Sequence, residues 1–139
     1  MAPGRLFDIA SETAAALEQL ECFKNITVAP VSSGAQLFDT LESMTRFPSA
    51  LIAIAGADYD EEGLERNLRL LIVVADRYRR SSADKASGIW ELLEKVQDLA
   101  LEKGLIPCGI PMTPVNFDPL DSGDENITAF AFTLEGSEA

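Results

Sequence analysis

The chain has 139 residues, of which 47% are hydrophobic and 24% are charged, and its formal net charge is −12. This length and composition are typical of one globular domain that can bury a hydrophobic core. The chain contains no histidine, which excludes Ser-His-Asp and Cys-His catalysis and every histidine-based metal site. The acidity argues against a specific nucleic-acid binder, because such proteins usually present a basic face to phosphates.

The first third of the chain predicts a helix, a strand and a second helix. Apolar side chains recur on one helical face over residues 6–23, which indicates an amphipathic helix. The short β-branched segment 25–31 predicts a strand, and Pro30 is expected at its end or at a sheet edge. Residues 32–47 predict a second helix, which ends before Pro48.

Two long apolar runs, residues 49–57 and 67–76, predict two strands. Each run is apolar on both faces, which favours a central position in a sheet. The acidic segment between them, residues 58–66, is short enough to connect the strands as an antiparallel hairpin with a long loop. Alternating carboxylates from Asp58 onward resemble the start of a calcium loop. The twelfth position is Arg69, however, where a calcium loop needs a bidentate glutamate, so we interpret this segment as a solvated acidic loop.

The last third of the chain predicts a helix and a final strand. The helix is expected over residues 86–103, with Gly104 as its stop signal. Four prolines then hold residues 105–126 extended, and the alternating pattern of residues 127–136 predicts a strand. The helix is expected to bury its side from Ile89 and Trp90 onward. The predicted buried stripe consists of Ile89, Leu92, Leu93, Val96 and Leu99.

The predicted element order is α-β-α-β-β-α-β. Long strands that follow one another without an intervening helix favour an α+β fold. We therefore expect one domain over residues 1–139, with a largely antiparallel sheet of about four strands flanked by helices.

Neither an export signal nor a membrane-spanning segment is recognisable in the sequence. We therefore expect a cytoplasmic location and no membrane partner. The two cysteines, Cys22 and Cys108, are expected to be reduced thiols in apolar surroundings. No catalytic pair, metal site or phosphate-binding glycine loop is recognisable, so we expect neither enzymatic activity nor a cofactor.

One basic stretch, "RYRRSSADKASGIW", follows the second long apolar run. Its arginine cluster consists of Arg77, Arg79 and Arg80. Three interpretations are open: a solvated strand end, a phosphate or DNA site, or a contact with an acidic protein surface. The phosphate interpretation is the weakest, because no glycines are present to cradle a phosphate.

A second copy of this chain would supply such an acidic surface at residues 58–62 and 121–125. Arginine binds carboxylates through a planar fork, which suits a contact of this kind. We call the first of these surfaces the acidic tip. It consists of Asp58, Asp60, Glu61 and Glu62.

Three segments carry a resemblance to a known family: "FPSALIAIAG", "NLRLLIVVADRYRRSSADKASGIWELLEKVQDLAL" and "ITAFAFTLEG". Their spacing and residue types resemble those of small tail-completion proteins of Mu-like prophages, which are regarded as tail terminators. In such proteins a strand that begins with proline is followed by a loop and a long second strand. A polar loop then leads to a helix that begins near a glycine and an aromatic residue, here Gly88 and Trp90. The resemblance spans about residues 47–136.

The resemblance implies an α+β subunit that assembles as a hexameric ring at the end of the phage tail tube. Such a ring stops tube polymerisation, docks the neck or connector protein and lets DNA pass through its lumen. It would place the protein in the virion, or in the bacterial cytoplasm during assembly. The arginine cluster and the acidic tip would then be candidate contacts between subunits.

Two alternatives remain open at the level of sequence. The first is another head-tail joining protein or a protein-interaction adaptor of the same fold, which its co-purifying partners would distinguish. The second is an unrecognised small-molecule enzyme, which would require a closed pocket lined by convergent polar groups.

Overall fold

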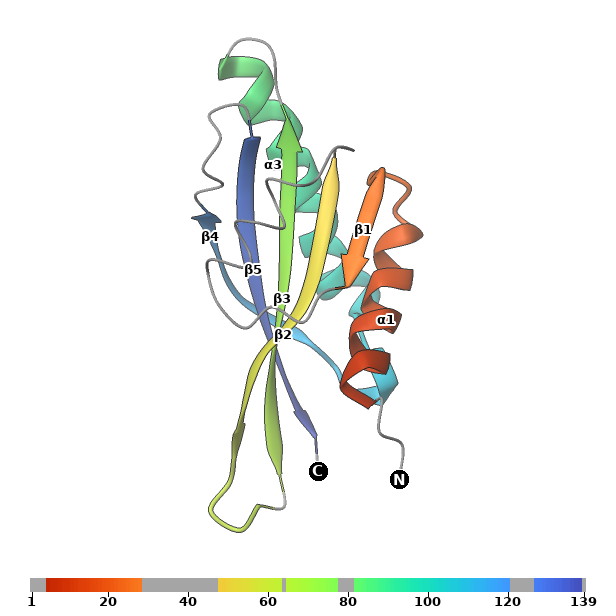
Figure 1. Cartoon of the computed structure of the whole chain (residues 1–139), viewed down its shortest axis with the longest axis vertical. Helices are drawn as coiled ribbons and strands as arrows, with labels where there is room; N and C mark the ends of the chain where they lie inside the picture. Colours follow the sequence, from red (N-terminus) through yellow and green to blue (C-terminus); the bar gives the residue numbers. More distant parts are fainter. Residues whose placement is uncertain (1–4, 29–47, 64, 78–81, 121–126, 139) are drawn as a thin grey trace.

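Five strands form a single mixed sheet in the order β1-β2-β3-β5-β4 (Figure 1). The computed structural model describes residues 5–28, 48–63, 65–77, 82–120 and 127–138. The predicted helix at residues 32–47 and the acidic segment 121–125 lie outside the described residues. The principal elements are α1 (Arg5–Glu18), β1 (Asn25–Val28), β2 (Ser49–Tyr59), β3 (Arg66–Arg77), α3 (Ser82–Asp98), β4 (Thr113–Leu120) and β5 (Ile127–Glu138).

The sheet confirms the predicted α+β class and its largely antiparallel pairing. β3 pairs antiparallel with β2 from Arg66 to Ala75 on one side, and with β5 over its whole length on the other. β4 is antiparallel to β5, whereas the short β1 runs parallel to β2. The two apolar runs thus occupy interior positions, as their apolar character on both faces indicated.

The expected number of about four strands is wrong, because the proline-rich segment contributes the additional strand β4. Prolines cannot donate a hydrogen bond to a sheet, so they are tolerated mainly in edge strands. β4 lies at the edge and contains Pro114 and Pro119. The prolines correctly indicated an extended chain, but pairing with β5 is decided by the tertiary structure.

The two described α-helices cover one side of the sheet (Figure 1). Their buried side chains form one core cluster with β2, β3 and β5. A second, smaller cluster lies on the other sheet face and contains Leu51, Val73 and Ala129. Neighbouring residues of β3 alternate between the clusters, since successive side chains of a strand point to opposite faces. The whole predicted stripe is buried: Ile89, Leu92, Leu93 and Val96 of α3, and Leu99 directly after its end.

The burial predicted for Trp90 is wrong, because 59% of this side chain is exposed. Each helical residue is rotated by about 100° from the one before it. Ile89 faces the sheet and is 1% exposed, so the next residue turns away from the core. Trp90 instead lies on the flank of α3.

The helix boundaries also differ from those predicted. α1 ends at Glu18 rather than at residue 23, and Glu21 has a φ of 57°. A left-handed residue of this kind does not continue a right-handed helix. α3 begins at Ser82 and continues into a π-helical turn, Leu99–Gly104. Gly104 has a φ of 82° and ends it, as predicted.

Candidate functional site

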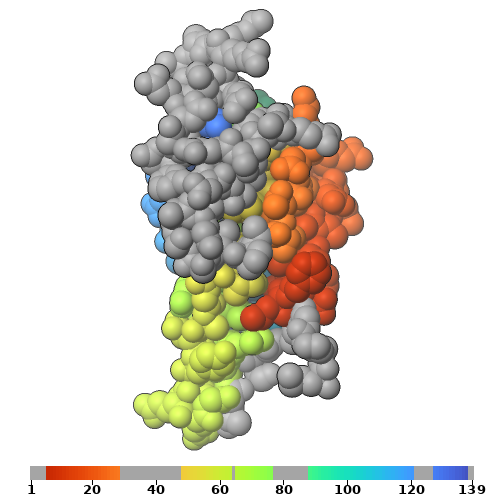
Figure 2. Space-filling view, viewed as in Figure 1, coloured from red at the N-terminus to blue at the C-terminus, as the bar shows by residue number. Residues whose placement is uncertain are grey.

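The β2–β3 hairpin extends beyond both helices at one end of the molecule (Figure 1), and the space-filling view shows this end projecting past α1 (Figure 2). β2 and β3 remain paired as far as Asp58↔Asn67 and Tyr59↔Arg66. The predicted loop at residues 58–66 is therefore too long. Two backbone hydrogen bonds close the turn of the hairpin. They run from Asp60 N–H to Glu65 O and from Gly63 N–H to Asp60 O, and both are 3.1 Å long.

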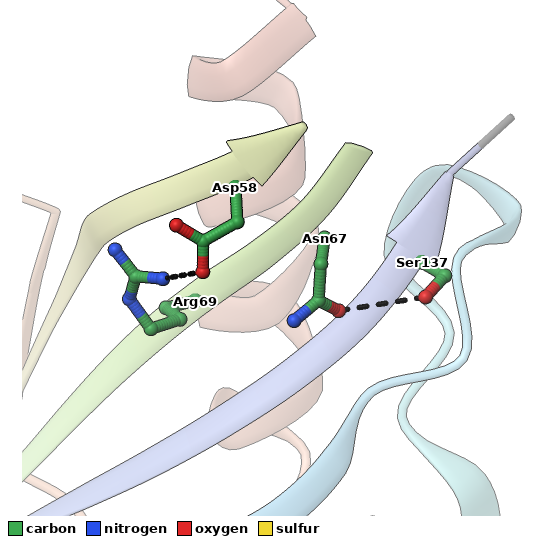
Figure 3. A network of polar contacts seen from close by, with 4 residues as sticks. All are labelled: Asp58, Asn67, Arg69 and Ser137. Carbon is green, nitrogen blue, oxygen red and sulfur yellow. Dashed lines mark hydrogen bonds and ion pairs between the residues drawn. The ribbon is translucent and has the colours of Figure 1, made fainter. Parts of the chain in front are cut away.

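Asp58 of the acidic tip forms an ion pair with Arg69 of the neighbouring strand (Figure 3). The Asp58 side chain is 70% exposed and that of Arg69 is 33% exposed. Gly56 makes room for this arginine, since a Cβ at Gly56 would lie 2.5 Å from Arg69 Nη2. One carboxylate of the acidic tip, which the sequence predicted to contact a partner, is therefore neutralised by an arginine of the same subunit.

The outermost acidic residues, Glu61 and Glu62, are exposed in the turn, as is Asp60. Arg77 is the last residue of β3 and pairs with Ile127 of β5. Arg79 and Arg80, the rest of the arginine cluster, lie outside the described residues.

The acidic tip and Arg77 lie at opposite ends of β3. The strand spans Arg66–Arg77, and at about 3.3 Å per residue it is roughly 36 Å long. Arg77 and the acidic tip therefore do not meet within one subunit. The sequence had indicated the acidic tip and the arginine cluster as candidate contacts, but it could not show how far apart the acidic tip and Arg77 lie.

Sequence reasoning missed an exposed apolar surface between α3 and β4. It forms two adjoining hollows of about 370 and 390 Å³, which share Gln97 and Phe117 as lining residues. We call this surface the apolar hollow. Its large exposed side chains are Trp90 (59% exposed), Leu101 (59%), Val115 (53%) and Phe117 (45%). The sequence feature that could have revealed this surface was Trp90, a large apolar residue that lies outside the predicted buried stripe.

Aromatic packing supports the strand side of the apolar hollow. The ring centroid of Phe117 lies 5.1 Å from that of Phe132 and 5.9 Å from that of Phe130. Such offset and edge contacts are favourable beyond simple area burial. Because Phe132 is 2% exposed, Phe117 rests on a packed base and presents its outer side to solvent.

Both cysteines are reduced thiols, as predicted, and both are half-buried. Burial raises the pKa of the Cys22 thiol, and the charge of Lys95 partly opposes this effect. Cys108 lies beside Glu12 of α1. Its backbone N–H donates to Oε1 at 3.1 Å, and its Sγ lies 2.8 Å from Oε2. These contacts attach the segment before β4 to α1.

Within the described ranges, no group of three or more Cys, Asp or Glu side chains is arranged to hold a metal ion. No helix in the described part of the chain is long and apolar enough to span a membrane. Comparison with models of known families finds no match, and no curated protein matches the sequence significantly.

Proposed function

We propose that this protein is a phage or prophage tail terminator, a structural subunit that assembles head to tail into a hexameric ring. The ring caps the tail tube and docks the neck or connector protein. The observation that carries the proposal is the placement of the acidic tip and Arg77 at opposite ends of one strand.

A closed ring requires a heterologous interface, in which two different patches of the subunit meet. Arg77 and the acidic tip are roughly 36 Å apart along β3, so their mutual contact requires two copies. Glu61 and Glu62 are exposed and their carboxylates suit the planar fork of arginine. The arginine cluster of one copy would then contact the acidic tip of the next.

The remaining parts of the proposal rest on charge and on the resemblance of the sequence to tail terminators. A net charge of −12 suits a lumen through which DNA passes without being bound. The tail-tube and connector proteins are the partners that the resemblance implies. No nucleic-acid sequence, membrane or cofactor takes part.

The mass in solution, measured alone and with the candidate tail-tube protein, tests the proposal. A hexamer of this 15.0 kDa chain would have six times that mass, about 90 kDa. We expect this species either for the chain alone or once tube protein is added. A monomer at every concentration, unchanged by tube protein, would contradict the proposal.

Charge reversal tests which residues form the contact. Arg79→Glu with Arg80→Glu should impair assembly, and so should Glu61→Lys with Glu62→Lys. Because each reversal repels its unchanged partner, all four changes in one chain should restore assembly. Glu18→Lys with Glu21→Lys alters the same charge at two other exposed positions and serves as the control. Unchanged assembly of the arginine variant would assign Arg79 and Arg80 to a solvated strand end.

A further inference from the structure

We infer that Arg69 is a positioning residue, which fixes the register of the hairpin end, residues 58–63 and 65–67, and so orients the outermost carboxylates of the acidic tip. This inference rests on the head-to-tail contact proposed above and deepens it. The sequence indicated Asp58 as a contact with a partner, but Asp58 is engaged by Arg69 of its own subunit. The two glutamates of the acidic tip then face the arginine cluster of the next copy.

Burial of side chains does not specify the register of the hairpin end. Shifting a strand by one residue turns its side chains to the opposite sheet face, which is costly where one face is buried. Successive side chains of β2 point to opposite faces, and Asp58 and Tyr59 are both exposed. A one-residue shift at this end would therefore exchange one exposed side chain for another. The register has to be held by a different kind of contact.

A bulge in β2 precedes the hairpin end. The register shifts between Ile54 and Gly56, so Ala55 is the additional residue of the bulge. As a result, Gly56 lies opposite Arg69, and Asp58 lies on the same face two residues further along. In a register without the bulge, Ala55 would lie opposite Arg69. Asp58 would then point to the other sheet face.

Arg69 fits the bulged register through both terminal nitrogens of its guanidinium group. Nη1 donates a hydrogen bond to Asp58 Oδ2 (Figure 3). Nη2 occupies the space beside Gly56, where a Cβ would lie only 2.5 Å from it. The Arg69 side chain is 33% exposed, so it lies along the sheet. The ion pair in this conformation therefore requires a glycine opposite Arg69, which the register with the bulge provides.

The turn that carries Glu61 and Glu62 depends on the same register. Asp60 N–H donates to Glu65 O directly beyond the last residue pair of the two strands. A one-residue shift of β2 against β3 would break this alignment and reorient the two glutamates. Their direction matters for the proposed contact, because arginine binds a carboxylate through a planar fork of fixed geometry.

Two substitutions with opposite effects on charge test the inference. Arg69→Ala and Asp58→Asn both remove the ion pair, but the first makes the acidic tip more negative and the second makes it less negative. Each should raise the dissociation constant of assembly by about 2- to 5-fold, the effect of losing an exposed ion pair. If charge alone decided the contact, Arg69→Ala would lower the constant. Sedimentation equilibrium measures it, with tube protein present where the ring requires it.

Matched controls change the same charges elsewhere. Lys24→Ala and Glu18→Gln alter exposed side chains that lie outside the hairpin, and both should leave the constant unchanged. Circular dichroism confirms that each variant is folded.

A third substitution tests the role of Gly56. Gly56→Ala places a Cβ where Nη2 of Arg69 lies, so it should weaken assembly as well. In an Arg69→Ala background the same change should have a smaller effect, because no guanidinium group is left to displace. Gly56 has a φ of 157°, which alanine disfavours equally in both backgrounds. Equal effects in the two backgrounds would contradict the inference.

Amide hydrogen exchange, followed by NMR, reports on the register in the free subunit. The Asp60 and Gly63 amides close the turn. In Arg69→Ala they should exchange about 2- to 5-fold faster than in the unaltered chain, whereas the amide of buried Ile72 should be unaffected. A loss of protection at Ile72 as well would show a general loss of stability in place of a local change, and would contradict the positioning role.

The outcomes separate this inference from the proposed function. A ring whose dissociation constant shifts in opposite directions in Arg69→Ala and Asp58→Asn, or whose turn amides exchange at an unchanged rate in Arg69→Ala, overturns the inference alone. A chain that stays monomeric with and without tube protein overturns both.

Discussion

The two halves of the β2–β3 hairpin are both paired antiparallel, with a register shift between Ile54 and Gly56, but they differ in what surrounds them. The hairpin body, residues 50–53 and 70–75, is buried except for half-buried Leu71. The hairpin end, residues 58–63 and 65–67, is largely exposed. Backbone hydrogen bonds therefore define the strands in both halves, but burial of apolar surface distinguishes them energetically.

Polar contacts take the place of burial at the hairpin end. Arg69 pairs with Asp58, and Ser137 Oγ donates to Asn67 Oδ1 at 3.4 Å (Figure 3). Exposed contacts of this kind contribute little to stability. Substitutions that change the charge of the hairpin end should therefore alter the free energy of unfolding only slightly. This tolerance suits a surface that recognises a partner.

The largest effect is expected in the hairpin body. Ile72→Ala should lower the free energy of unfolding by about 2–5 kcal/mol, because it leaves a cavity in the core. Ile72 is fully buried. Urea denaturation measures the change, and Tyr59→Ala at the exposed hairpin end should cost no more than about 0.5 kcal/mol. Equal losses of unfolding free energy in Ile72→Ala and Tyr59→Ala would contradict the energetic difference between the hairpin body and the hairpin end.

A smaller loss is expected where β5 passes the segment before β4. A Cβ at Gly136 would lie 2.8 Å from the backbone oxygen of Pro111 and 2.6 Å from Met112 Sδ. Gly136→Ala should therefore cost about 1–3 kcal/mol through overpacking. Thermal and urea denaturation check this, with Ser137→Ala as the neighbouring control. A loss below that of the control would show that the segment moves aside freely.

The ion pair of the hairpin end should contribute less. Arg69→Ala should cost at most about 1 kcal/mol, since Asp58 is largely exposed and solvent screens the pair. A double-mutant cycle with Asp58→Ala isolates the pair, and the coupling should fall as salt is raised. A coupling energy as large as the stability loss in Ile72→Ala would contradict the view that the hairpin end contributes little to the free energy of unfolding.

The smallest effect concerns Cys22, whose thiol has its pKa raised by burial. Its folded pKa lies above its unfolded value, so the stabilisation is present below the unfolded pKa. It is lost as pH rises through the folded pKa. Iodoacetamide should modify Cys22 more slowly than it modifies the unfolded chain, in a Cys108→Ser background. Equal rates across pH 8–10, roughly the range around an ordinary thiol pKa, would contradict burial of this thiol.

The sequence predicted the described elements well where the pattern was local. Residues 49–57, 67–76 and 127–136 were expected as strands and lie within β2, β3 and β5. The buried stripe of α3 was also predicted residue by residue. Hydrophobic periodicity carries this information, because it reports which side of an element faces a core.

The candidate surfaces could be predicted only in part. The acidic tip and the arginine cluster were recognisable from charge, but the pairing of Asp58 with Arg69 depends on the register of two strands. The apolar hollow escaped prediction, because it joins α3 to a strand that is distant in sequence. Trp90 illustrates the limit: an apolar residue next to a buried stripe does not reveal whether another element covers it.

The sequence by itself determined the α+β class, the central strands and the separation of charge along the chain. Only the tertiary structure decided that β4 joins β5, that β1 runs parallel to β2 and that Trp90 is exposed. The physical reason is that local patterns specify which faces become buried. The choice of neighbour depends instead on pairing and packing between distant segments.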